Sequence, residues 1–346
     1  MAELVWIGKN KFNLDDQFQQ LLSRQLFTVR SYPLQDTHSP ADAWHNRLIL
    51  GDKNDALPIL LRELGSAVNL IYIDPPFMTE RDFMGSGAGS PQLAYSDKWG
   101  HDLDTYLQWL YETFTLLHAL LAEHGSLYVH LDWRAIHYAK VILDEVFASG
   151  AKAEGAGFKS EIIWHYQSGG RSQHCYARKH DTILLYTKSA HYCFHGDRIG
   201  ERRGAQKRNH MRKRVQADGH VTWTIRSGGR VYTYDEDAPM TPSDVWSDIS
   251  HLHQKDPQRN GYATQKPAAL LERIILASSD EDDLVLDCCC GSGVTPAAAE
   301  RLRRRWIACD QSRLAIQLTE ERLQGCEDIR PFVVQKIQEV PETRLP

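Results

Sequence analysis

The stretch DLVLDCCCGSGVTPAAAERL, residues 283–302, indicates the fold of this chain. An apolar run ends at Asp287 and predicts a buried strand, and an alanine-rich segment after the turn predicts a helix. Gly291 and Gly293 lie in that turn, where glycines let a ligand approach backbone N–H groups at the start of a helix. Nicotinamide and flavin enzymes need a third glycine where Pro296 stands, so those cofactors are disfavoured. By itself the pattern also fits a plain tight turn.

The segment that follows adds a second acidic group. WIACDQS, residues 306–312, predicts a strand that ends on Asp310, about twenty residues after the glycine turn. An acid at that position can accept hydrogen bonds from ribose hydroxyls, so the pair favours an adenosine-containing cofactor. Asp310 could equally cap the next helix, and the two roles are compatible.

Strands and helices alternate through most of the chain, which predicts an α/β fold with one doubly wound, parallel sheet. The periodicity fades between about residues 195 and 260 and returns at TQKPAALLERIILAS, where Pro267 suits the first turn of a helix. Strands are predicted within 46–50, 68–73, 125–132, 160–166, 181–187, 284–287 and 306–310, and helices within 53–64, 104–121, 135–147, 265–278, 295–305 and 313–323.

This pattern divides the chain into four segments. Residues 1–45 show no clear periodicity and stay unassigned. Residues 46–194 form one half of the predicted sheet, 195–260 form an insertion, and 261–346 form the half that carries the glycine turn.

Composition excludes several classes of protein. With 346 residues, 42% of them apolar, the chain can bury a sizeable core. No apolar run approaches the roughly 20 residues of a membrane helix, and the first residues lack the apolar stretch of a secretory signal. Seven cysteines without a CxxC pair argue against a disulfide framework and a zinc site. We therefore expect no metal, no membrane partner and a reducing cytoplasm.

The predicted insertion is strongly basic, although the whole chain has a net charge of −5. Between Arg198 and Arg230 ten basic residues face two acidic ones, a net charge of +8. This segment is either a solvated basic surface or a surface that contacts nucleic-acid phosphates. Gly228 and Gly229, with aromatic residues nearby, suit a mobile loop that becomes ordered on nucleic acid. The candidate contacts are Arg202, Arg203, Lys207, Arg208, Arg212, Lys213, Arg214, Arg226 and Arg230.

A rigid acidic corner follows the strand in VNLIYIDPPF, residues 68–77. Pro75 and Pro76 have a fixed φ and no N–H, which leaves their carbonyls as free acceptors in fixed directions. Asp74 adds a carboxylate, so the corner suits an –NH2 group, and Phe77 offers a flat face for a flat ring. An amino-bearing aromatic ring is a nucleobase. A rigid turn after a strand is the structural alternative.

At these residues the chain resembles the amino-methylating DNA methyltransferases. Asp74-Pro75-Pro76-Phe77 matches the family's catalytic tetrapeptide, (D/N/S)-P-P-(Y/F/W), and residues 264–267 match its TQKP motif. The motif order resembles the β group, a circularly permuted form of the same Rossmann-like sheet. In such relatives the insertion is the target-recognition region. The family's cofactor motif is matched by Asp287, Gly291, Ser292, Gly293 and Thr295.

The resemblance implies transfer of a methyl group from S-adenosylmethionine to adenine N6 in double-stranded DNA at a specific site. Cytosine N4 methylation and a cofactor-bound DNA-binding protein with little turnover stay open as alternatives. A cognate restriction endonuclease and a homodimer are compatible with it. Cys288 and Cys289 stand where the family has Pro-Phe, which predicts a looser cofactor pocket. The implied catalytic residues are Asp74, Pro75, Pro76 and Phe77, and the implied cofactor-binding residues are Asp52, Thr264, Gln265, Lys266, Pro267, Asp287, Gly291, Ser292, Gly293, Thr295 and Asp310.

Overall fold

The computed structural model describes residues 3–14, 23–32, 44–87, 90–148, 155–167, 172–202 and 210–339. The chain forms two compact units. The larger unit combines Met1–Cys193 with Asp244–Pro346, and the smaller one is Phe194–Ser243.

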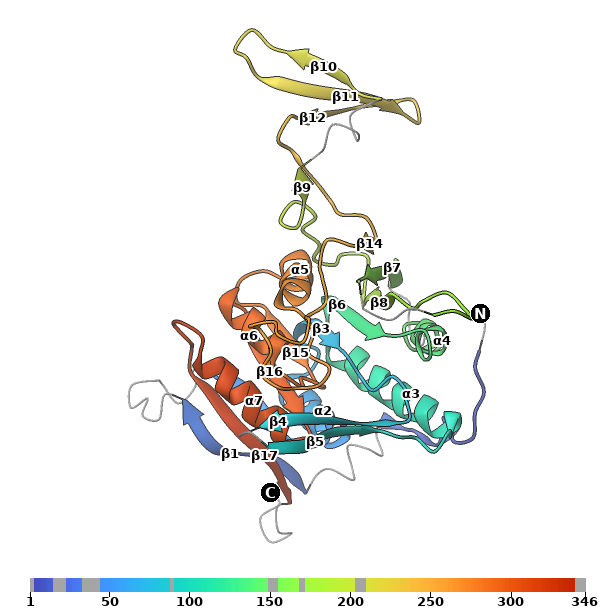
Figure 1. Cartoon of the computed structure of the whole chain (residues 1–346), viewed down its shortest axis with the longest axis vertical. Coiled ribbons are helices and arrows are strands. Elements are labelled where there is room, and N and C mark those ends of the chain that lie inside the picture. The colour runs from blue at the N-terminus through green and yellow to red at the C-terminus, as the bar shows by residue number, and fades with distance from the viewer. Residues whose placement is uncertain are drawn as a thin grey trace. The chain divides into compact units, whose positions relative to one another are not determined.

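The larger unit is built on one sheet of ten strands among the described residues (Figure 1). The six strands from β17 to β6 run parallel to one another. The predicted doubly wound α/β sheet is therefore confirmed. In spatial order the strands are β1 (Arg24–Tyr32), β17 (Phe332–Glu339), β2 (Asn46–Leu50), β16 (Arg305–Asp310), β15 (Leu284–Asp287), β3 (Val68–Ile73), β6 (Leu121–Leu131), β8 (His180–Thr187), β7 (Gly157–His165) and β14 (Val245–Trp246).

Helices cover both faces of this sheet (Figure 1). Side chains alternate between the faces of a strand, so Ile71 and Ile73 pack into one core while Leu70 and Tyr72 pack into the other. The first core includes apolar residues of α2 (Lys53–Leu64), α3 (Leu103–Leu120) and α4 (Ile136–Val146). The second includes those of α5 (Ala268–Ser278), α6 (Val294–Arg301) and α7 (Arg313–Gln324).

The sheet is not parallel throughout, contrary to the prediction. Strand β8 runs antiparallel to both β6 and β7. Two parallel neighbouring strands need a crossover connection, which is usually a helix. The described residues between β7 and β8 contain no helix, which agrees with the antiparallel pairing. At the opposite edge β1, in the unassigned segment 1–45, pairs antiparallel with β17. The same segment holds the short helix η1 (Lys9–Lys11).

Two boundaries differ from the sequence analysis. Pro267 is the N-cap of α5, with ψ 144°, and so stands just before the first turn of the helix. The smaller unit ends at Ser243, whereas the predicted insertion extends to residue 260. The reason is that β14 pairs with β7 and joins residues after 243 to the large sheet.

The smaller unit contains a regular antiparallel sheet, where a mobile loop was predicted around Gly228 and Gly229. That prediction is wrong for these residues, because they form a tight turn that pairs Ser227 with Arg230. Both glycines have positive φ, 55° and 79°, as a two-residue hairpin turn requires. The sheet contains β10 (Arg212–Val215), β11 (Val221–Ser227) and β12 (Arg230–Asp235), and a second pair joins β9 (Glu201–Arg202) to β13 (Pro239–Met240).

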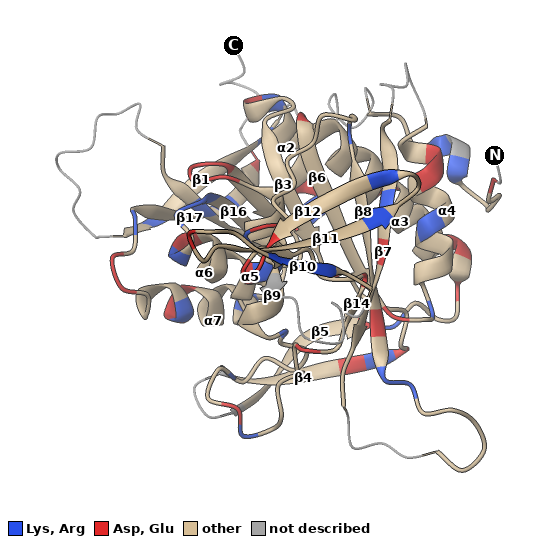
Figure 2. Ribbon diagram, turned by 90° about the horizontal axis from the view of Figure 1, so that it is seen from above, with Lys and Arg blue, Asp and Glu red and all other residues tan. Residues whose placement is uncertain are grey.

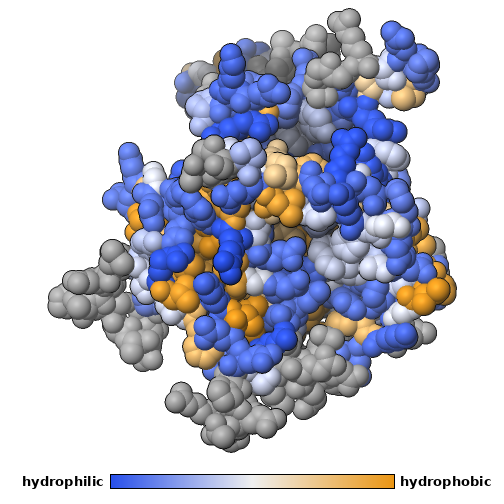
Figure 3. All heavy atoms as spheres, turned by 60° about the horizontal axis from the view of Figure 1, so that its bottom comes forward, coloured by the Kyte–Doolittle hydropathy of each residue, from blue (hydrophilic) through white to orange (hydrophobic). Residues whose placement is uncertain are grey.

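Among the described residues no helix is long and apolar enough to cross a bilayer. On the face drawn in Figure 3, hydrophobic residues form small groups interrupted by hydrophilic ones.

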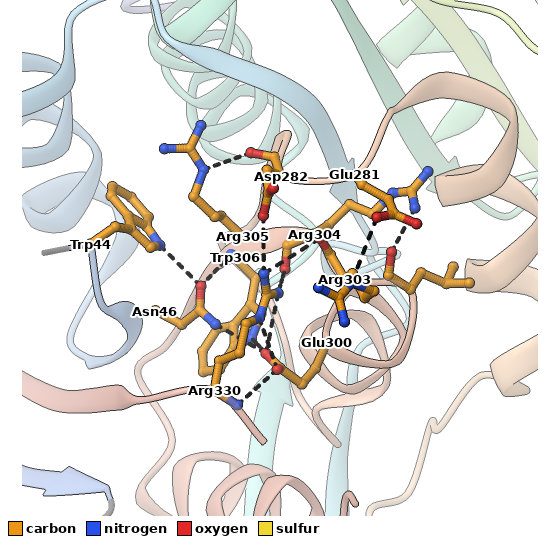
Figure 4. A network of polar contacts seen from close by, with 11 residues as sticks. Trp44, Asn46, Glu281, Asp282, Glu300, Arg303, Arg304, Arg305, Trp306 and Arg330 are labelled. Carbon is orange, nitrogen blue, oxygen red and sulfur yellow. Dashed lines mark hydrogen bonds and ion pairs between the residues drawn. The ribbon is translucent and has the colours of Figure 1, made fainter. Parts of the chain in front are cut away.

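A buried polar network ties the end of α6 to three other segments (Figure 4). The carboxylate of Glu300 accepts hydrogen bonds from Asn46 Nδ2 at 3.0 Å, Trp306 Nε1 at 2.7 Å and Arg330 Nε at 3.0 Å. Asn46 Oδ1 in turn accepts from the backbone N–H of Trp306 and from Trp44 Nε1. Glu300 therefore connects the start of β2, the strand β16 and the segment before β17.

We expect Glu300→Ala to lower the free energy of unfolding by about 2–5 kcal/mol, because it leaves the buried Asn46 Nδ2 and Trp306 Nε1 donors without their acceptor and removes the ion pair with Arg330. The matched control is Glu272→Ala, since Glu272 pairs with Arg301 on the exposed side of the neighbouring helices and should cost less than about 1 kcal/mol. Urea unfolding of both variants measures the difference. Equal losses would show that the buried network contributes no more than a surface pair.

Candidate active site

A pocket opens where four neighbouring parallel strands end. Strands β2, β16, β15 and β3 are adjacent in the sheet, and each ends at or just before an aspartate: Asp52, Asp310, Asp287 and Asp74. All four aspartates line the same pocket, which has about 930 Å³ of empty space, part of it open to solvent. Ligands of open α/β sheets bind at this edge, and the size suits a small organic cofactor.

Most of the predicted catalytic and cofactor residues line this pocket. They are Asp52, Asp74, Pro76, Thr264, Lys266, Asp287, Gly291, Ser292, Thr295 and Asp310. Pro75, Phe77, Gln265, Pro267 and Gly293 do not line it.

Two of these five residues, Gln265 and Gly293, have structural roles near the pocket. The buried Gln265 amide accepts a hydrogen bond from Asn260 N and donates one to Gln258 O, so it holds the preceding loop. A Cβ on Gly293 would lie 2.6 Å from Thr319 Oγ1, so the glycine permits close packing of α6 on α7.

Asp74 has one occupied and one unoccupied carboxylate oxygen. Its Oδ2 forms an ion pair with the ammonium of Lys266, a residue that lies 192 positions away in the chain. Its Oδ1 is buried and has no hydrogen-bond partner among the described residues. A buried acceptor without a donor is costly, so this atom is a site at which a ligand N–H would be stabilised.

The two proline carbonyls of the corner are not both free, contrary to the prediction. The hydroxyl of Tyr106 donates to the Pro76 carbonyl at 2.7 Å. The Pro76 carbonyl therefore already has one donor, and the predicted acceptor role of these carbonyls toward a base stays a prediction. The Phe77 ring lies beside this corner, with Lys266 Nζ 5.3 Å from its centroid.

Asp97, at the end of β5 (Ser90–Asp97), holds the segment after the corner in place. Its carboxylate is 1% exposed and accepts from the backbone N–H groups of Phe77, Met78 and Thr79 at 2.8–3.2 Å. It also accepts from Thr79 Oγ1 and Trp99 Nε1. Strand β5 pairs with β4 (Arg81–Gly87), which begins just after this segment. Asp97 was not predicted from the sequence. It lies twenty residues after Phe77, and an acid at the end of a strand carries no local signal of so distant a contact.

A buried chain of polar groups supports the opposite side of the corner. Tyr72 lines the pocket, and its hydroxyl lies 2.9 Å from His130 Nδ1. His130 Nε2 lies 3.2 Å from Asp181 Oδ2, and Tyr166 donates to Asp181 Oδ1 at 2.9 Å. Each of these groups has a partner, so the hydroxyl of Tyr72 is fixed in the pocket wall. None of the four residues was singled out from the sequence.

Asp310 binds the glycine turn directly. Gly291 N donates to its Oδ2 at 2.9 Å, and Ser312 N donates to its Oδ1 at 2.8 Å. The helix α7 is capped by the side chain of Ser312, which accepts from Ala315 N. Asp310 is thus not the cap, and it lines the pocket. Burial raises the pKa of Asp310 to about 6.

Asp287 also holds the turn. Its carboxylate accepts from Thr295 Oγ1 at 2.5 Å and from Cys289 N at 3.0 Å. Burial raises the pKa of Asp287 to about 7, although these two hydrogen bonds oppose the shift. Both acids therefore shape the turn as well as lining the pocket.

Aromatic rings from outside the predicted motifs complete the walls. Tyr95 and Tyr262 are stacked, with ring centroids 6.3 Å apart, and Tyr262 lies against Gly291. The buried Lys53 ammonium lies 3.9 Å from the centroid of the Trp109 ring, and burial lowers the pKa of Lys53. That Cys288 and Cys289 make the cofactor pocket looser stays a prediction. Aromatic side chains line the pocket even though the family's phenylalanine is replaced.

The predicted DNA contacts fall on the smaller unit. Arg212, Lys213 and Arg214 form most of β10, Arg226 lies on β11 and Arg230 starts β12. Arg202 belongs to β9, but its side chain is outside the described set, and Arg203, Lys207 and Arg208 lie outside the described residues.

Comparison with known proteins identifies the family. A family model described as DNA methylase, N6_N4_Mtase, matches residues 68–321. The chain belongs to this DNA methylase family. The resemblance inferred from the motifs is thereby confirmed, while its assignment to the β group stays a prediction.

Relatives of this DNA methylase include two bacterial enzymes. The Type II methyltransferase M.HpaI of Haemophilus parainfluenzae is 30% identical over 259 residues, 75% of this chain and 68% of that protein. The DNA adenine methyltransferase YhdJ of Escherichia coli strain K12 is 28% identical over 275 residues, 78% of this chain and 80% of that protein.

Two solved structures share the fold. PvuII DNA methyltransferase (cytosine-N4-specific) has a TM-score of 0.53 and 17% identity, with 82% of this chain and 87% of that chain covered. TTHA0409 of Thermus thermophilus, complexed with S-adenosyl-L-methionine, has a TM-score of 0.51 and 18% identity, with 84% and 97% covered.

Membership of this family confirms S-adenosylmethionine as the predicted cofactor, and the pocket suits it. The lining contains four aspartates and two lysines, an excess of negative charge that favours a ligand with a positive sulfonium. The stacked pair Tyr95 and Tyr262 adds flat apolar surface for a ring.

The raised pKa values of Asp287 and Asp310 predict that cofactor affinity depends on pH. A cation favours the ionised carboxylates, so binding should release protons, and affinity should rise from pH 5.5 to about pH 7.5 and then level off. Calorimetry in two buffers of different ionisation enthalpy measures the released protons. S-adenosylhomocysteine, whose sulfur is neutral, is the control and should show a smaller effect. An S-adenosylmethionine affinity that is constant across this range would contradict the explanation.

Proposed function

We propose that this DNA methylase transfers the methyl group of S-adenosylmethionine to the exocyclic N6 amino group of adenine in double-stranded DNA, at a specific site. The observation that carries the proposal is the buried Oδ1 of Asp74, which lacks a donor among the described residues and lies in the pocket that suits the cofactor. An –NH2 group would supply the missing donor.

Two observations support adenine. Asp74 occupies the first position of the tetrapeptide, where relatives that methylate adenine more often have Asp and those that methylate cytosine N4 more often have Ser. The relative YhdJ, which aligns over most of this chain, is named a DNA adenine methyltransferase. Methylation of cytosine N4 is the alternative outcome of the test below.

The cofactor would be held at the edge of the sheet between β2 and β15. Asp310 has free lone pairs for ribose hydroxyls, and Asp52, Thr264 and Ser292 add polar groups around it. When bound, S-adenosylmethionine supplies an electrophilic methyl group. Glycine at position 291 keeps the turn close to this space, with its backbone N–H already fixed by Asp310.

The acceptor corner would activate the amino nitrogen. The lone pair of that nitrogen is delocalised into the base, which makes it a weak nucleophile. Asp74 Oδ1 and the Pro75 carbonyl would accept one N–H each, which draws the nitrogen toward tetrahedral geometry and directs its lone pair away from the ring. As the new N–C bond forms, the bond between the methyl carbon and the sulfonium sulfur would break. S-adenosylhomocysteine would leave with that electron pair, and Asp74 would take the proton that the nitrogen loses. No covalent enzyme intermediate is required, and positioning supplies most of the rate.

Lys266 would act as a positioning residue for Asp74. Because its ammonium holds Oδ2, the carboxylate is not free to rotate, and Oδ1 stays directed at one place. The family motif at residues 264–267 was predicted to bind the cofactor, and Lys266 does line the pocket. Its ion pair supports a second role for Lys266, in orienting the Asp74 carboxylate.

The base would have to leave the duplex to reach this corner. Phe77 would then stack on it, an interaction worth roughly 1–3 kcal/mol per base. The proposed chemistry requires neither a cognate restriction endonuclease nor a homodimer. Both stay predictions from the sequence.

We expect Asp74→Ala to lower methyl incorporation into DNA by at least about 100-fold, since the lost acceptor acts in the transition state, while S-adenosylmethionine still binds. Phe77→Ala should lower activity partly, and Phe77→Trp should retain most of it, because tryptophan keeps a flat face. Mass spectrometry of the digested product DNA distinguishes N6-methyladenine from N4-methylcytosine. Robust activity in the Asp74 variant would reject the mechanism.

Lys266→Met should lower kcat for methyl transfer about 10- to 100-fold, because Asp74 can then rotate out of position. Lys266→Arg should restore part of the loss, since it keeps a cation beside Oδ2. The KM for DNA should change little in both variants. A large change in cofactor affinity with unchanged kcat would mean instead that Lys266 serves only the cofactor.

A further inference from the structure

The small sheet of β10, β11 and β12 has two chemically different faces. Side chains alternate along each strand, and the register aligns Arg212 with Thr224 and Lys213 with Trp223. The first face, here called the arginine face, carries Arg212, Arg214, Thr222, Thr224, Arg226, Val231, Thr233 and Asp235. The second, the aromatic face, carries Lys213, Val215, Val221, Trp223, Ile225, Ser227, Arg230, Tyr232 and Tyr234.

The cations of the arginine face are available to an external anion. Arg212, Arg214 and Arg226 are exposed, and within the described part of the chain none of them forms an ion pair. The one acid of this face, Asp235, lies 3.0 Å from His220 Nε2 at the edge of the sheet. The basic positions of β10 appear in blue in Figure 2.

Lys213 is in a different situation, although it stands between two of these arginines in the sequence. Its ammonium lies 3.7 Å from the carboxylate of Glu236 and 5.7 Å from the centroid of the Trp223 ring. Its charge is therefore already compensated within the unit. A sequence run of three basic residues on a strand cannot present all three to one surface.

We propose that the arginine face is the surface of this unit that contacts the phosphates of duplex DNA, and that the aromatic face is not. This inference rests on the proposed function and specifies which side chains meet the substrate. Guanidinium groups bind phosphate oxygens with several N–H donors at once. Arg212 and Arg214 lie about 7 Å apart on one edge strand, so both can meet one DNA backbone.

The test compares two double variants that each remove two positive charges. Arg212→Gln with Arg214→Gln alters the arginine face, and Lys213→Gln with Arg230→Gln alters the aromatic face. Affinity for a duplex of about 30 base pairs is measured at several salt concentrations in the full-length chain with S-adenosylmethionine present. The arginine-face variant should flatten the slope of log affinity against log salt by about 1.8, or about 0.9 per lost phosphate contact. The aromatic-face variant should keep the wild-type slope.

Equal slopes in the two variants, or a larger change in the aromatic-face variant, would overturn the proposal. Circular dichroism checks folding, and the single variant Arg226→Gln, expected to flatten the slope by about 0.9, serves if the double variant unfolds. Failure of the proposed function looks different, because the wild-type chain would then form no N6-methyladenine in DNA. A wild type that methylates DNA with equal slopes in both variants would reject the face assignment alone.

Discussion

The carboxylate of Asp97 is the constraint on which the acceptor corner depends. The two prolines have no N–H groups to donate, and the residues after them adopt strained backbone conformations, with positive φ at Met78 and Glu80. Asp97 binds three successive N–H groups there, from Phe77 to Thr79, and so holds the chain in this path. That support fixes the backbone that carries the Phe77 ring, whereas the Asp74 carboxylate is held by Lys266.

The pocket concentrates negative charge because parallel strands end at one edge of the sheet. Four aspartates come together there, and hydrogen bonds from the glycine turn, a helix terminus and Lys266 partly offset the cost of burying them. The resulting excess of acid makes the pocket selective for a cation. The ion pair of Asp74 with Lys266 also joins the acidic corner to the segment that opens α5, so the proposed cofactor and base sites share one wall.

In the smaller unit, side chains alternate between the two faces of the sheet, so the two faces differ in composition. Arginine and threonine lie on one face, and aromatic residues with the compensated Lys213 lie on the other. A sheet of this kind can bind a polyanion through one face, because the two faces carry different charged groups. The charge of the segment is a property of its composition, but the direction of that charge is a property of its register.

The sequence by itself determined the alternating strands and helices, the glycine turn and the acidic proline corner, because each is a local pattern of burial and backbone conformation. The hairpin at Gly228 and Gly229 was predicted as a mobile loop, although a glycine pair between two strand-like segments is a local signal for a hairpin turn. Only the tertiary structure decided that Lys266 pairs with Asp74, that Asp97 holds the corner and that Tyr106 occupies the Pro76 carbonyl. These contacts join residues far apart in the chain, and a polar side chain at a strand or helix end looks the same whether its partner is water or another residue. The antiparallel β8 has the same cause, because strand direction depends on the connection in space and leaves no mark on the strand's own residues.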